Sequence, residues 1–189
     1  MNNTPFMRTC PRRINRALAI AILAFAPQLA HAQPPQPQPV VTFVFPAGAS
    51  RGQTVEATIN GRDFQNASGV RITGPGVTGK IVQVVNPNSV KVAFTVAPDA
   101  ELSERDLRLI TPGGISNRVR FFIGALPEIN EVEPNTDRSK PQQLASLPVL
   151  INGQILDNDR DCFRFPAKAG QMIVCAVQAR TLLAYLRRD

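Results

Sequence analysis

Apolar and polar residues alternate along the middle of this chain, and Gly, Pro and Asn interrupt the alternation at short intervals. In residues 54–60, Val55, Ala57 and Ile59 share one side of an extended backbone, while polar side chains occupy the other side. Such a pattern predicts short strands with one buried face. Seven strands are predicted, at residues 40–45, 54–60, 70–73, 80–85, 90–96, 106–111 and 118–123. We therefore expect an all-β protein whose main domain is a small antiparallel sandwich without long helices.

Glycine, proline and phenylalanine recur through residues 40–125 at positions that suit tight turns and a compact core. In chain order the series is Pro46, Gly48, Gly52, Val55, Ile59, Gly61, Phe64, Val70, Pro98, the run from Thr111 to Asn117, and Phe121. In this series the segment resembles an IPT/TIG domain, which is an immunoglobulin-like sandwich. The resemblance implies that the glycines form turns, that the phenylalanines fill the core, and that the domain binds or spaces rather than catalyses.

Residues 1–32 have the three parts of a secretory signal peptide. Arginines from Arg8 to Arg16 precede an apolar run at residues 17–26, and a small-residue cleavage site ends at Ala32. The apolar run, about ten residues long, is too short to cross a bilayer as a helix. We therefore expect cleavage after Ala32 and export to the periplasm, the cell surface or the medium, with no membrane span left in the mature chain.

Composition argues against imidazole catalysis and against a nucleic-acid partner. The sole histidine, His31, falls within the predicted signal peptide, so no histidine remains for a catalytic triad or a zinc site. The formal charge of +7 includes four arginines of that peptide, and their removal leaves about +3. The remaining basic residues are scattered among acids, there is no Trp, and Tyr185 is the only Tyr. Neither a phosphate-binding face nor a stacking platform is expected.

A proline-bracketed acidic run follows the predicted sandwich at residues 126–137. Pro127 and Pro134 argue against a buried strand or a regular helix, so we interpret the run as a junction between two domains. The run carries the carboxylates of Glu128, Glu131, Glu133 and Asp137. Oxygen ligands of this kind are what a hard cation such as Ca²⁺ prefers.

After the junction the sequence predicts the start of a second β domain. We expect one helical turn at residues 140–147, strands at 149–155 and 162–165, a turn at 166–170 and a return strand at 172–179. The predicted organisation is thus a signal peptide at 1–32, a Pro- and Gln-rich linker at 33–39, the sandwich at 40–125, the acidic junction at 126–141 and the second domain at 142–189.

Four short motifs of this half stand in a fixed order: Glu133-Pro134-Asn135, Ile151-Asn152-Gly153, the run from Asp159 to Phe165, and Ala169-Gly170-Gln171. In these motifs it resembles the bacterial pre-peptidase C-terminal domain, a jelly-roll-like β-sandwich appended to secreted peptidases and surface proteins. The tandem is similar to secreted multidomain proteins of planctomycete type. Because only part of such a domain follows the junction, we expect an incomplete sandwich and a sequence that is a truncated product or a fragment.

The second resemblance also implies a calcium site. Some members bind Ca²⁺ through an acidic junction motif together with aspartates before a Phe-containing strand. The corresponding ligands here are Glu131, Glu133, Asn135, Asp159 and Asp161. Thr136 stands where an acid or amide is usual. The alternative is an exposed turn of charged residues without an ion.

Two cysteines remain after signal cleavage, Cys162 and Cys175, on the two strands of the predicted hairpin. An even number of cysteines in an oxidising compartment is consistent with a disulfide, but a cross-strand bridge demands specific geometry, so we favour two reduced, half-buried thiols. A catalytic thiol is not expected, because no histidine is present to activate one.

These observations predict a non-catalytic exported accessory protein that mediates adhesion, spacing or binding of an extracellular protein or polysaccharide. The alternative is a fragment of a secreted peptidase precursor whose catalytic part is missing. Apart from Ca²⁺, no cofactor is expected.

Overall fold

The computed structural model describes residues 1, 34–155 and 159–179, and every regular element in them is a β-strand. All of these strands lie within Pro35–Asp189, one of the two units into which the chain divides. The predicted signal peptide and the last ten residues of the predicted second domain lie outside the described residues. Within the described residues no helix could span a membrane.

Four antiparallel strands form the first sheet, in the order β1-β3-β6-β5. They are β1 (Val40–Phe45), β3 (Thr54–Arg62), β6 (Ser89–Val96) and β5 (Val77–Asn86). In β6, Val90, Val92, Phe94 and Val96 point to the buried face, as the period-two pattern requires. Strands β1 and β5 are the edges of this sheet.

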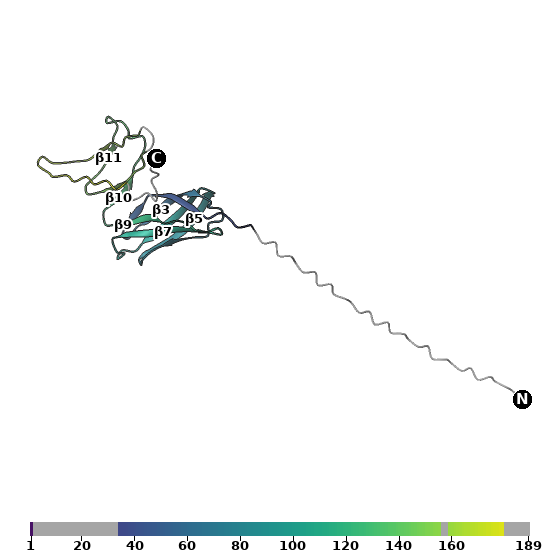
Figure 1. Cartoon of the computed structure of the whole chain (residues 1–189). Coiled ribbons are helices and arrows are strands. Elements are labelled where there is room, and N and C mark those ends of the chain that lie inside the picture. The colour runs from purple at the N-terminus through teal and green to yellow at the C-terminus, as the bar shows by residue number, and fades with distance from the viewer. Residues whose placement is uncertain (2–33, 156–158, 180–189) are drawn as a thin grey trace. The chain divides into compact units, whose positions relative to one another are not determined.

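The second sheet has the order β2-β9-β7-β4, and β8 also pairs with β7. Its strands are β2 (Gly48–Ser50), β9 (Val119–Gly124), β7 (Glu104–Thr111), β4 (Gly69–Ile72) and β8 (Gly114–Ile115). Strand β2 runs parallel to β9, and the other pairs are antiparallel. Figure 1 shows the two sheets packed face to face.

A single hydrophobic core fills the space between the two sheets. Phe94 of the first sheet and Phe121 of the second are both fully buried, and their ring centroids lie 4.5 Å apart with an interplanar angle of 35°. Leu107 and Leu109 contribute from β7, and Ile59 from β3. Tilted aromatic contacts of this kind add to the free energy of apolar burial. The predicted all-β sandwich is confirmed.

All seven strands predicted for the sandwich are present, with ends shifted by up to three residues. The buried face predicted for β3 is also correct, since Ala57 and Ile59 are fully buried and Val55 packs against the core. Strands β2 and β8 were not predicted. Each is too short to show a hydrophobic period, and each forms only because a longer strand, β9 or β7, lies beside it.

Beyond residue 125 the described strands are short and form two parallel pairs. Strand β10 (Glu128–Asn130) pairs with β12 (Leu150–Asn152), and β11 (Gln142–Gln143) pairs with β13 (Phe163–Arg164). Leu144 is the one buried hydrophobic residue that the structure describes in this part, and it lies outside the main core. This C-terminal segment therefore has little apolar burial to stabilise it.

Two predictions for the C-terminal segment are wrong. The helical turn at 140–147 is absent, because Gln142 and Gln143 form β11 instead. Residues 172–179 are not a strand, and most of them are exposed, although Gly170 adopts the positive φ of the predicted turn. The acidic run was predicted to contain no buried strand, and its first part forms the short β10, which has no buried residue and pairs with β12.

Shortening Phe121 tests the role of the aromatic core. We expect Phe121→Ala to lower the free energy of unfolding by about 3–5 kcal/mol, because it leaves a cavity beside Phe94. Val85→Ala, at an exposed position on β5, is the control and is expected to cost less than about 0.5 kcal/mol. Urea denaturation of both variants measures the difference, and equal costs would contradict the assigned core.

Candidate metal centre

Three carboxylates from two distant parts of the sequence meet in the C-terminal segment. One ligand oxygen from each of Glu131, Glu133 and Asp161 lies within 4.8 Å of the others. Glu131 and Glu133 follow β10, and Asp161 precedes β13. These are three of the five residues that the resemblance to the pre-peptidase type implied as calcium ligands.

Backbone hydrogen bonds explain why these carboxylates converge. The N–H of Glu131 donates to the Asn152 carbonyl (2.8 Å), which continues the register of β10 with β12. The N–H of Cys162 donates to the Asn135 carbonyl (3.1 Å). Asp161 is therefore brought next to the segment that carries Glu133, while Glu131 is held against β12.

Two of the three carboxylates have an oxygen that is buried without a hydrogen-bond partner. These atoms are Glu131 Oε2 and Asp161 Oδ1. Loss of solvent raises the pKa of both carboxyl groups, and the negative charges of their neighbours raise it further. Buried oxygens in this state are stabilised by a cation, which replaces the lost hydration and screens the mutual repulsion.

A glycine next to the cluster leaves room for Glu131. A Cβ atom on Gly153 would lie 2.7 Å from Glu131 Oε2, closer than packed atoms allow. The other oxygen, Glu131 Oε1, accepts a hydrogen bond from the N–H of Gln154. The carboxylate is thus fixed at one oxygen, and its second oxygen is buried without a hydrogen-bond partner.

Asn135 is the most deeply buried polar residue of this region, with 1% of its surface exposed. Its backbone N–H donates to Glu133 Oε2 (3.0 Å), but neither Oδ1 nor Nδ2 of its side chain has a partner. The Oδ1 atom can therefore serve a cation as a neutral ligand. An amide nitrogen cannot act as a ligand of a hard cation, so the Nδ2 atom of Asn135 would stay without a partner when an ion is bound.

Asp159 lies close to the cluster but outside the tight group of three oxygens. Its charge contributes to the raised pKa of Glu131 and Asp161. Its Oδ1 accepts hydrogen bonds from Thr136 Oγ1 (3.3 Å) and from the N–H of Arg160 (2.8 Å). Thr136, which looked unsuitable as a ligand in the sequence, instead holds the Asp159 side chain in place.

The residues fit a hard cation. The cluster offers three carboxylates, and neutral side-chain oxygens, backbone carbonyls and water would complete the six to eight oxygens that Ca²⁺ takes. No thiol or imidazole lies among the three clustered groups, which disfavours a soft transition metal. When bound, the ion would supply charge neutralisation and a cross-link between residues 131–133 and 161.

The two cysteines are free in this structure. Cys175 is exposed, and the return strand that was to place it opposite Cys162 is absent. Cys162 is half-buried, with its Sγ 3.6 Å from the Thr136 carbonyl. The prediction of free thiols matches the structure, whereas the predicted half-burial holds for Cys162 and is wrong for Cys175.

No known protein-family model and no curated protein matches this sequence. The assignment of the centre therefore depends on the chain's own geometry.

The carboxyl group of Glu128 lies outside the three-carboxylate cluster, and its pKa is also raised. Its Oε2 accepts a hydrogen bond from Asn152 Nδ2 (3.2 Å), across the β10–β12 pair. Burial raises the pKa of this carboxyl group, and hydrogen bonds from Asn152 and Ser50 oppose the shift without cancelling it. The folded chain thus holds the Glu128 proton to a higher pH than the unfolded chain does.

The raised pKa predicts that Glu128 lowers stability as the pH rises. Between the unfolded and the folded pKa the folded chain binds more protons, so the free energy of unfolding falls with increasing pH. We expect Glu128→Gln to match the wild type below about pH 4 and to be the more stable protein at pH 7. Thermal melting in EDTA at both pH values measures this, with exposed Glu101→Gln as the control for loss of charge. A variant less stable at pH 7 would contradict the prediction.

Proposed function

We propose that this chain is a non-catalytic, exported binding protein made of β-modules, in which Ca²⁺ at the acidic centre orders the segment after the sandwich. The signal-like residues 1–32, the glycine and phenylalanine series of the IPT/TIG type and the motifs of the pre-peptidase type support the proposal. The main observation is the pair of buried, unpartnered oxygens of Glu131 and Asp161, grouped with Glu133 within 4.8 Å.

Weak apolar packing gives the cation its structural role. Val132, Met172, Val174 and Val177 are exposed, and the described strands beyond residue 125 are two or three residues long. Apolar burial therefore contributes little to the ordering of this segment. A bound ion joins Glu131 and Glu133 to Asp161 and closes the long loop between them, so its binding free energy becomes folding free energy.

A calcium titration of the mature chain tests the proposal. We expect heat on binding and a rise in melting temperature, with about 2.7 kcal/mol of added stability when Ca²⁺ stands at 100 times its Kd. Glu131→Gln and Asp161→Asn should each weaken binding at least about tenfold, because each removes a charged ligand. Glu101→Gln removes an exposed charge elsewhere and should bind as the wild type does. Absence of both heat and a melting shift in the wild type would remove the calcium role.

Gly153 offers a test that changes no ligand. In Gly153→Ala the new methyl group would push the Glu131 carboxylate out of its position, so we expect Ca²⁺ affinity to fall several-fold. The matched control is Gly69→Ala, because a Cβ there would lie 3.7 Å from Ile110 Cδ1, an ordinary contact. Calorimetry measures the Ca²⁺ affinity of both variants, and unchanged affinity in Gly153→Ala would contradict the need for this position of the Glu131 carboxylate.

A further inference from the structure

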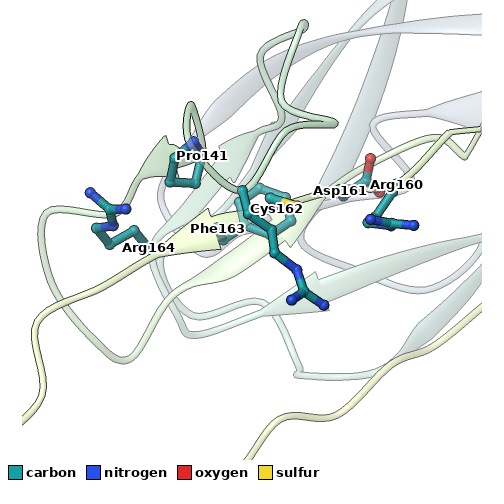
Figure 2. Close-up of a pocket in the computed structure, with 7 residues that line it drawn as sticks. Pro141, Arg160, Asp161, Cys162, Phe163 and Arg164 are labelled. Atoms are coloured by element: carbon teal, nitrogen blue, oxygen red, sulfur yellow. The ribbon is translucent and has the colours of Figure 1, made fainter.

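A hollow of about 430 Å³ lies beside β13, next to the acidic centre. Three arginines line it, Arg138 from the turn before β11, and Arg160 and Arg164 from the segment of β13. Figure 2 shows Arg160 and Arg164 toward opposite ends of the hollow, with Cys162 and Phe163 between them. Pro141 and Phe163 give the hollow an apolar part.

The arginines of the hollow have no acidic partner among the residues that the structure describes. The four ion pairs found there all belong to the sandwich. The single acid in the lining, Asp161, has its oxygen grouped with Glu131 and Glu133. Each of the three arginines is exposed, so their guanidinium groups remain accessible to a ligand.

Residues 160–164 all line the hollow, so Asp161 borders both the hollow and the acidic cluster. Arg160 and Arg164 stand on either side of it in the sequence, and Arg138 approaches from the turn before β11.

We propose that this arginine hollow binds the carboxylates of an acidic peptide segment in an extended conformation. The inference rests on the proposed function, since it names the ligand of the binding module. A guanidinium group matches a carboxylate through two parallel hydrogen bonds, and three such groups that form no ion pair can bind several carboxylates of one peptide.

The strand edge favours a peptide over a polysaccharide. Within the described residues β13 pairs only with β11, which leaves one edge of β13 open to another extended chain. A polysaccharide cannot complete a β-ladder, and a sugar ring prefers an aromatic platform. The hollow provides one phenylalanine, itself half-buried, for that purpose.

The spacing of the arginines specifies the ligand further. Arg160 and Arg164 are four residues apart, which is about 13 Å along an extended backbone. A peptide with glutamates at every second position places all its carboxylates on one side at matching intervals. In a peptide with the same number of glutamates in one block, successive carboxylates point to opposite sides of the backbone, so they cannot all lie on one side at these intervals.

Fluorescence anisotropy on the mature chain with Ca²⁺ tests the inference. The probes are fluorescein-labelled Ala-Glu-Ala-Glu-Ala-Glu-Ala, the Gln analogue, a block peptide of equal charge and a heparin oligosaccharide. We expect the alternating acidic peptide to bind most tightly and the Gln analogue not to bind. Binding of the heparin oligosaccharide without binding of the acidic peptide would overturn the inference, and so would equal binding of the block peptide.

Charge-matched variants separate the hollow from general attraction. Arg160→Gln with Arg164→Gln should weaken peptide binding at least about tenfold, whereas Arg71→Gln with Arg118→Gln, on the sandwich, should change it less than about twofold. If the first double variant fails to fold, the single variant Arg138→Gln replaces it in the test. We expect this variant to bind the peptide with several-fold lower affinity. Equal losses in both double variants would overturn the inference.

The calcium titration separates this inference from the proposed function. Arg138→Gln and the Arg160/Arg164 variant should keep the calcium-induced melting shift, because neither removes a carboxylate of the cluster. Wild-type protein that shows the shift but binds no acidic peptide would refute the hollow alone. Peptide binding in the absence of any shift would support the hollow and refute the calcium role.

Discussion

The contact between Phe94 and Phe121 joins the two sheets on which the rest of the structure depends. Both strands alternate buried and less buried residues, so each presents one continuous apolar face to the other sheet. Burial of these faces supplies the main stabilising free energy of the described chain. The candidate functional residues of this protein accordingly lie outside the sandwich, where packing does not determine every residue.

The C-terminal segment is stabilised in a different way from the sandwich. Its strands are short and parallel, and Leu144 is its one buried hydrophobic residue among those described. Hydrogen bonds from Glu131 to Asn152 and from Cys162 to Asn135 hold it together, and they also force carboxylates into proximity. A segment that is stabilised so weakly by packing can respond to an ion or a ligand, because a single added interaction is then a large share of its stability.

Much of the candidate centre could be predicted, but its geometry could not. The resemblance to the pre-peptidase type implied Glu131, Glu133 and Asp161 among five ligands, and the structure brings these three together. The sequence could not show that Gly153 makes room for Glu131, or that Thr136 binds Asp159. The arginines of the hollow gave no sequence signal, since scattered basic residues usually lie on solvated surfaces.

The sequence by itself determined the class and the strands of the sandwich. A period of two in hydrophobicity is a local property that persists wherever one face must be buried, as in Val55, Ala57 and Ile59. Tertiary structure alone decided β2, β8, β10 and β11, because two or three residues form a strand only when a neighbour supplies hydrogen-bond partners. It also decided which charges meet, because contacts between residues far apart in sequence depend on strand pairing and not on local composition.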